Sequence, residues 1–207
     1  MSINTPGYYI LNQYHNARIK TAVAKALHEH PRTLMIRVDL YLPDKSFNAD
    51  SAQMTRFIAS LKAQVNADIQ RRINTGVRVH PCNLRYVWTR EFCQSEIKHY
   101  HVALLFNKDT YAYPGTYRPG ENGEYMYNLS LMIMEAWVRA LSLDKDEGYK
   151  KHYSLVHFTH HNYRHLNVSS PSFSVDYDEV LTWLSYFAKE YSKNHSDGQR
   201  NFGSSQS

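Results

Sequence analysis

Hydrophobic positions along the chain follow two spacings, one typical of helices and one typical of strands. Four segments carry apolar side chains at every third or fourth position, which predicts amphipathic helices. They are 8–29, 54–69, 125–141 and 178–193. Four other segments are predicted to be strands, the clearest of which alternates strictly between apolar and polar positions. They are 33–42, 84–92, 99–106 and 150–158. Residues 108–124 contain two prolines and three glycines, which predicts a long surface loop.

Strands interrupted by helices that can cover them predict an α+β fold. We expect an antiparallel sheet with helices packed on one face, which leaves the other face free for a substrate. A length of 207 residues fits one domain with short extensions. We expect residues 1–30 to be an N-terminal helical extension and residues 31–193 to form the domain. The polar, Gly/Ser-rich segment 194–207 is expected to be disordered.

The composition narrows the function classes only slightly. A formal net charge of +5 permits a nucleic-acid partner, and 17 tyrosines offer surfaces on which bases can stack. No window approaches about 18 unbroken apolar residues, so a membrane span is not expected. The N-terminal segment carries repeated charges and does not resemble a signal peptide, which indicates a cytoplasmic protein. Cys82 and Cys93 match no zinc spacing and are expected to be free thiols.

A His-X-His pair on a predicted strand is the first candidate for chemistry. Side chains alternate along a strand, so His99 and His101 point to the same face, while Tyr100 points to the apolar face. A hairpin turn centred on Ser95 would place Glu91 directly opposite His99 and on the same face. Two imidazoles and a carboxylate suit a divalent metal with open positions, and Mg²⁺ or Mn²⁺ is expected with a phosphate substrate. Zn²⁺ would also bind these ligands.

Two alternatives to this metal site remain open. His-X-His pairs are common on strand surfaces without any metal. A register shift of one residue in the hairpin would move Glu91 to the other face, and Glu96 would then be the nearest acidic ligand.

The last predicted helix carries the second candidate for chemistry. Tyr186, Lys189, Glu190 and Lys193 fall on its polar stripe, whereas Tyr191 falls on the apolar stripe. A phenol needs activation before it can attack a phosphodiester, and the two lysines would stabilise its charged form. Glu190 could act as a base toward a water or a 3′-hydroxyl. The alternative is an exposed tyrosine among ordinary helical charge pairs.

Several basic residues are candidates for DNA contacts, and Lys193 of the last predicted helix is one of them. Arg37 and Arg85 would lie on an open sheet face and could hold a strand without any metal. Arg164 lies within a second histidine cluster whose irregular spacing suggests a loop. A solvated or phosphate-contacting loop is favoured there over a second metal site. The cluster comprises His157, His160, His161 and His165.

The two motifs together resemble the HUH endonucleases, which include rolling-circle replication initiators, transposases and relaxases. The resemblance implies an HUH/Rep-like domain with an RRM-like core. Glu91, His99 and His101 match the metal part of that pattern, and Tyr186, Lys189 and Lys193 match its tyrosine helix. Glu190 stands where a two-tyrosine enzyme would have its second tyrosine, which implies a one-tyrosine enzyme.

Most of residues 30–193 also resemble the prophage-encoded YagK/YfjJ family, which is grouped with the filamentous-phage gene II replication protein. The runs 34–44, 99–107 and 183–189 carry this likeness. It implies nicking and joining of single-stranded or hairpin DNA through a 5′-phosphotyrosine, with host replication proteins as further partners. Two other functions stay open: a relic that binds DNA without catalysis, and a structural or regulatory prophage protein that binds neither DNA nor metal.

Overall fold

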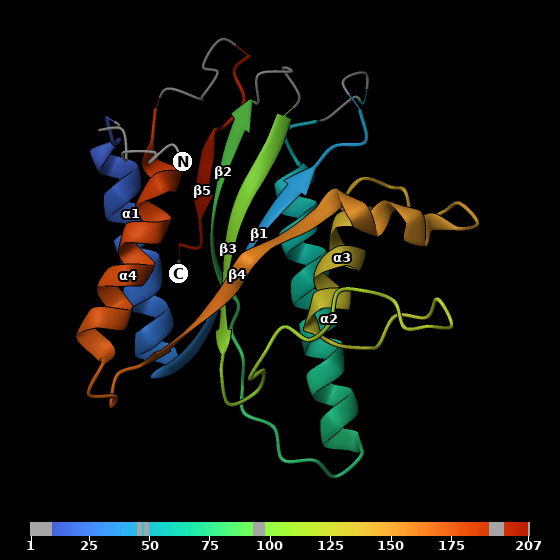
Figure 1. Cartoon of the computed structure of the whole chain (residues 1–207), viewed down its shortest axis with the longest axis horizontal. Coiled ribbons are helices and arrows are strands. Elements are labelled where there is room, and N and C mark those ends of the chain that lie inside the picture. Colours follow the sequence, from blue (N-terminus) through green and yellow to red (C-terminus); the bar gives the residue numbers. More distant parts are fainter. Residues whose placement is uncertain (1–9, 45–46, 48–49, 93–97, 191–196, 207) are drawn as a thin grey trace, which may run out of the picture.

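The centre of the molecule is a five-stranded antiparallel sheet with the strand order β4-β1-β3-β2-β5 (Figure 1). The computed structural model describes residues 10–44, 47, 50–92, 98–190 and 197–206. The strands are β1 (Arg32–Tyr41), β2 (Arg85–Phe92), β3 (Lys98–Asn107), β4 (Val156–Asn167) and β5 (Phe202–Ser204). The expected α+β class with an antiparallel sheet is therefore confirmed.

One face of the sheet carries the larger hydrophobic core. The helices α2 (Gln53–Asn74) and α3 (Leu129–Ala140) cover this face. Ile36 and Val38 of β1 are fully buried there with Phe57 of α2 and Trp137 of α3. The strict alternation along β1 places every second side chain in this core, as the sequence predicts.

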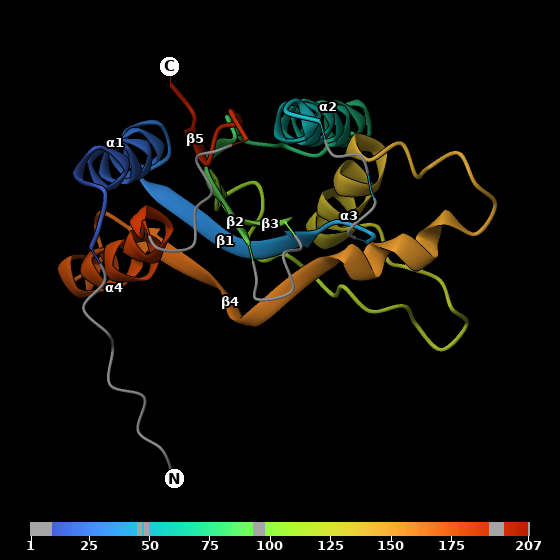
Figure 2. The same ribbon diagram turned by 90° about the horizontal axis from the view of Figure 1, so that it is seen from above.

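A second pair of helices packs on the opposite face, so the prediction from the sequence that this face is free was wrong. The helices α1 (Gln13–Glu29) and α4 (Phe173–Ser185) lie side by side there (Figures 1 and 2). They cover the apolar end of this face, around Met35, Ala103 and Leu105. Its other end carries polar side chains. Among the described residues, no helix is both long enough and apolar enough to cross a membrane.

The region predicted as a strand at residues 150–158 is divided differently. A 3-10 helix, η1, spans Tyr149–Leu155, and β4 then continues through Val156–Asn167 along β1. β4 is an edge strand with few buried positions, so it lacks the hydrophobic alternation that reveals an inner strand. The pairing shifts between Ile36 and Val38, where four residues of β4 face the single residue Arg37. This bulge makes β4 irregular in its middle.

The last helix also differs from the expected range of 178–193. It begins at Phe173, after Ser172 at the N-cap, and ends at Ser185. A short 3-10 turn, η2 (Tyr186–Ala188), follows it, and Lys189 already has an extended backbone. Lys189 and Glu190 therefore do not lie on the helical stripe that the sequence predicted.

Both ends of the described chain are integrated into the fold. Leu11 pairs with Lys189, and α1 packs against β2, α4 and η2, so residues 10–30 form part of the domain rather than a separate extension. Residues 202–204 form β5 on the edge of β2, which corrects the expectation of a disordered C-terminal segment for residues 197–206.

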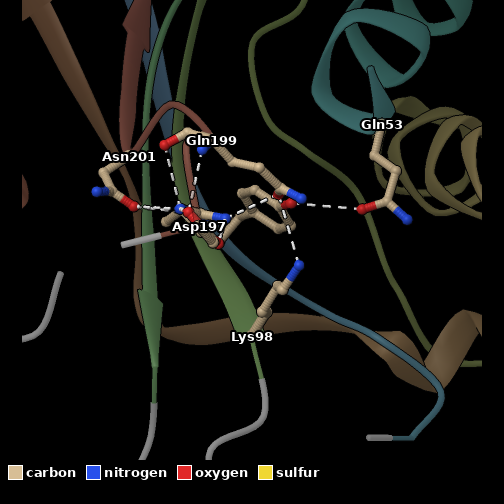
Figure 3. A network of polar contacts seen from close by, with 7 residues as sticks. Gln53, Lys98, Asp197, Gln199 and Asn201 are labelled. Carbon is tan, nitrogen blue, oxygen red and sulfur yellow. Dashed lines mark hydrogen bonds and ion pairs between the residues drawn. The ribbon is translucent and has the colours of Figure 1, made fainter. Parts of the chain in front are cut away.

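A buried arginine explains why the C-terminal segment is ordered. Arg90 is only 1% exposed, and its guanidinium donates hydrogen bonds to Asp197, Gln199 and Asn201 (Figure 3). A buried charge requires a counter-charge and hydrogen-bond acceptors. Only the returning C-terminal segment supplies the carboxylate that pairs with Arg90 in the described residues.

Candidate metal site and adjoining tyrosine

The polar end of the second sheet face consists of two rows of side chains that run across the strands. One row contains His157 of β4, Asp39 of β1, His101 of β3 and Thr89 of β2. The next row contains Tyr41 of β1, His99 of β3 and Glu91 of β2. Glu91 lies opposite His99, so the hairpin register expected from the sequence is confirmed. Glu96, the alternative ligand, lies outside the described residues.

Glu91, His99 and His101 form a compact group of possible metal ligands. One ligand atom from each residue lies within 4.8 Å of the others. The three side chains are almost buried, with residue exposures of 3%, 9% and 8%. Oε1 of Glu91 is buried and has no hydrogen-bond partner among the described residues. Leaving a carboxylate oxygen in this state is costly, and a cation would satisfy it. The donor set therefore fits a divalent metal with open positions.

Asp39 orients one of these histidines. Its Oδ1 lies 2.5 Å from Nδ1 of His101, and Nε2 of the same ring lies 3.5 Å from Oε2 of Glu91. If Nδ1 donates its proton to Asp39, the lone pair of Nε2 faces Glu91 and is available to a metal. A carboxylate behind a ligating histidine is the usual second partner in metal sites. The alternation along β1 predicted the face on which Asp39 lies, but nothing in the sequence indicated its pairing with His101.

The charges in this cluster support one another. Burial raises the pKa of Asp39, but the hydrogen bond to His101 and nearby positive charges outweigh it and hold the pKa below its usual value. Burial acts in the same way on Glu91, and His101 and Lys189 together lower its pKa. Burial lowers the pKa of His101, but Asp39 and Glu91 outweigh this effect and raise it. The two carboxylates therefore favour a positive charge at His101, which either a proton or a metal ion on Nε2 can supply.

Lys189 lies inside this cluster rather than on a solvent-exposed helical stripe. It is only 2% exposed, and its Nζ lies 3.0 Å from Oε2 of Glu91. The expectation of an exposed lysine failed because the helix ends four residues earlier, at Ser185. Burial lowers the pKa of Lys189, but its contacts with Tyr186 and Glu91 outweigh burial and raise it. Lys189 therefore remains positively charged and balances Glu91.

Tyr186 lies next to the same group of side chains. Its ring centroid is 5.8 Å from that of His101, at an angle of 73° between the ring planes. Nζ of Lys189 lies over the Tyr186 ring, 3.3 Å from its centroid. The cation thus touches both the candidate nucleophile and the candidate metal ligand Glu91. The structure thus brings together the His99/His101 motif and the Tyr186 motif, which lie far apart along the chain.

Arg37 lies beneath Tyr186 on the same sheet face. Its guanidinium is 5.6 Å from the Tyr186 ring and 5.5 Å from the Trp183 ring. The side chain is only 12% exposed, and its Nε lies 4.0 Å from Asp39. This Nε is buried without a hydrogen-bond partner among the described residues, so it is a donor that an oxyanion could satisfy.

Other candidate residues lie elsewhere or have other contacts. Arg85 is ion-paired with Glu29 of α1 and is 9% exposed, so it does not lie on an open face as expected. Glu190 accepts a hydrogen bond of 2.6 Å from Asn12, which links it to the start of α1. Arg164 stacks over Trp183 at 5.4 Å, near Arg37. Lys193 and Tyr191 lie outside the described residues, so the predictions for them stay predictions.

The second histidine cluster lies on β4 and not in a loop as expected. His157 joins the first polar row, with Nδ1 4.0 Å from Oδ2 of Asp39. His165 contacts the backbone carbonyl of Ala112 at 2.7 Å. His160 and His161 lie in the bulge, where His161 has a positive φ of 56°. These four histidines therefore separate into different environments, which does not favour a shared metal site.

Fold and site together define a class of protein: an α+β domain with a buried carboxylate–histidine cluster beside a tyrosine. The chain belongs to the YagK/YfjJ C-terminal domain family, whose model matches residues 5–205. It is 34% identical over 211 residues to the uncharacterized protein YagK of Escherichia coli (strain K12), covering 98% of this chain and 96% of that protein. It is 32% identical over 201 residues to the uncharacterized protein YfjJ of the same strain, covering 91% of each. No solved structure matches the chain.

Proposed function

We propose that the chain is an HUH-type endonuclease that nicks and rejoins single-stranded DNA with Tyr186 as the nucleophile. Its substrates are single-stranded or hairpin regions at the replication origin of a phage or prophage. In this proposal the protein acts in the cytoplasm together with host replication proteins.

The observation that carries the proposal is the position of Lys189 between Tyr186 and Glu91. Its ammonium lies 3.3 Å from the centroid of the tyrosine ring and 3.0 Å from the carboxylate of Glu91. A tyrosine that had only a packing role would not need a buried cation shared with a group of metal ligands. Burial of an ammonium is costly, so its retention next to a phenol supports a chemical role.

The proposed reaction conserves bonds and protons. The phenolic oxygen of Tyr186 gives its proton to a water molecule and attacks the phosphorus of a phosphodiester. The bond between phosphorus and the 3′-oxygen breaks, and that oxygen takes up a proton to become a free 3′-hydroxyl. Attack of a 3′-hydroxyl on the phosphotyrosine reverses these steps and restores a continuous strand.

The residues of this chain have separate tasks in the reaction. Lys189 stabilises negative charge on the phenolic oxygen, and Arg37 offers its unsatisfied Nε to a phosphate oxygen. Glu91, His99 and His101 would hold Mg²⁺ or Mn²⁺, which supplies Lewis-acid polarisation of the scissile phosphate. Asp39 keeps the ring of His101 in one orientation.

A covalent adduct assay tests the proposal. Tyr186 would retain the fragment on the 3′ side of the nick, so single-stranded origin DNA should carry its label at the 3′ end. With Mn²⁺, we expect a labelled protein band on a denaturing gel, and no such band in EDTA or with Tyr186→Phe. Tyr177→Phe, on the helix α4 that precedes Tyr186, is the matched control and should form the adduct. An adduct that persists in Tyr186→Phe would disprove the assignment of the nucleophile.

One observation favours a second candidate function, a relic that binds DNA without cutting it. The Lys189 ammonium already neutralises Glu91, so the negative charge of this carboxylate is balanced without any metal. Binding that is unaffected by EDTA, together with no adduct on any single-stranded origin, would support this reading over the first.

A further inference from the structure

A groove at the β5 edge of the sheet lies apart from the candidate metal site. It has a volume of about 1040 Å³ and is lined by residues from α1, α2 and β2, by residues 82–84, and by Arg200 and the segment 202–206. Figure 2 shows α1 and α2 on either side of β5. Among the described residues, its lining includes none of Glu91, His99 and His101. Any ligand in this groove would therefore bind independently of the metal ligands.

The lining of this groove is strongly positive. Its cationic side chains are Arg18, Lys62, Arg85 and Arg200, and Glu29 is its single carboxylate among the described residues. Glu29 is already ion-paired with Arg85. Lys62 and Arg200 are exposed, and within the described ranges neither forms an ion pair. A concave surface with one sign of charge concentrates anions of the opposite sign.

Aromatic rings lie among these cations. Phe202 of β5 stacks on His15 of α1, with centroids 4.2 Å apart and an angle of 14° between the rings. Nζ of Lys62 lies 5.9 Å from the centroid of the Tyr86 ring. Tyr14 is 66% exposed at the margin of the groove, next to Arg18. Rings and cations are thus interleaved along the groove.

We propose that this groove binds single-stranded nucleic acid, with phosphates on Arg18, Lys62 and Arg200 and bases on the aromatic rings. Cations that follow the backbone and rings that stack on bases are the two elements of single-strand binding. A duplex keeps its bases stacked on one another, so it could use the cations but not the rings. An acidic peptide would likewise leave the aromatic rings unused. The proposal goes beyond strand cleavage, because it requires neither metal nor Tyr186.

Fluorescence anisotropy with a labelled oligothymidine in EDTA tests the proposal on the full chain. The double variant Lys62→Ala/Arg200→Ala should raise the Kd about tenfold at low salt. It should also reduce the slope of log K against log salt by about 1.4, since each phosphate contact contributes about 0.7 for single strands. The matched control Lys145→Ala/Lys151→Ala removes two exposed lysines outside the groove. A control that weakens binding as much as the groove variant would overturn the proposal.

The aromatic contribution needs its own readout. Tyr14→Ala should weaken binding of oligothymidine but not of polyglutamate, whereas Tyr113→Ala, also an exposed tyrosine, should change neither. Displacement of the oligonucleotide by polyglutamate of equal charge at equal concentration would show an unspecific anion surface and overturn the assignment. The metal-site variant His99→Ala should bind oligothymidine like the wild type. A wild-type protein that binds oligothymidine but forms no adduct with single-stranded DNA in Mn²⁺ would therefore refute the nuclease proposal alone.

Discussion

Nδ1 of His101 lies 2.5 Å from Oδ1 of Asp39, across the pairing between β1 and β3. This contact directs the opposite ring nitrogen toward Glu91, which is 3.5 Å away. The orientation of the His101 ring is thus set by β1, which lies about 60 residues earlier in the chain and contributes no proposed metal ligand.

Asp39→Asn should weaken Mn²⁺ binding by about 10- to 100-fold, the usual effect of removing the partner of a ligating histidine. The amide can donate a hydrogen bond to Nδ1, which would place the proton of His101 on the nitrogen that the metal needs. Calorimetric titration of the protein with Mn²⁺ measures the effect. Asp144→Asn, an exposed aspartate, is the control. Equal Mn²⁺ affinity in the two variants would contradict the role of Asp39.

Lys189→Met should destabilise the protein in EDTA by about 3–5 kcal/mol, because Glu91 then remains buried without a counter-charge. Methionine keeps the unbranched shape of the side chain and most of its length, and it removes the ammonium with its charge and hydrogen-bond donors. Mn²⁺ should restore more stability to this variant than to the wild type, because a bound cation replaces the ammonium. Thermal unfolding with and without Mn²⁺ measures both effects.

The control for this experiment is Lys151→Met, which changes an exposed lysine and should leave both measurements unchanged. If Mn²⁺ stabilised Lys189→Met no more than the wild type, the ammonium and the metal would not share the carboxylate of Glu91.

The ion pair between Asp197 and Arg90 should make stability depend on pH. The hydrogen bond from Arg90 lowers the pKa of Asp197 from 3.8 to about 2. A carboxyl group whose pKa is lower in the folded protein than in the unfolded chain stabilises the folded state at pH values above its unfolded-state pKa. This stabilisation is lost as the pH falls through the folded-state pKa. Asp197→Asn should therefore lower the urea midpoint at neutral pH, and the difference from the wild type should shrink between pH 3.8 and about 2.

Urea unfolding of both proteins across this pH range measures the effect, with Asp178→Asn as the exposed control. A difference that stayed constant down to a pH of about 2 would mean that the carboxylate charge of Asp197 contributes nothing.

Gly203→Ala should destabilise the packing of β5. A Cβ atom at this position would lie 2.5 Å from the indole of Trp88, closer than real contacts allow. Relief of the clash requires movement of the indole or of the strand, at a cost of about 1–3 kcal/mol. Gly120→Ala is the control, since its Cβ would lie 3.3 Å from a side-chain oxygen of Asn122 and 3.6 Å from the backbone oxygen of Glu124. Tryptophan fluorescence during urea unfolding measures the difference, and equal midpoints would contradict close packing at Gly203.

The predictable part of the site lies within one hairpin. β2 and β3 are consecutive along the chain, so turn position and side-chain alternation were enough to place Glu91 beside His99 and His101. Asp39 could not be found in this way. β1 is separated from β3 by α2 and β2, and no local pattern states which strands pair across such a distance.

The sequence placed Lys189 on an exposed helical stripe, and this prediction was wrong for a related reason. A helical projection assumes that the helix continues, whereas this helix ends at Ser185 and the chain turns through η2. The segment after η2 pairs with Leu11, which lies near the N-terminal end of the described residues. Such a contact determines where the helix ends and is not encoded in its own periodicity.

The sequence alone determined the helices with strong apolar stripes, the inner strands and the face of each strand residue, because these depend on spacing within a few residues. Tertiary structure alone decided that Asp39 supports His101, that Lys189 enters the core and that β5 completes the sheet. Each of these contacts joins residues far apart along the chain. Each is favourable because it gives a buried charge or an unpaired strand edge a partner that neighbouring residues do not supply.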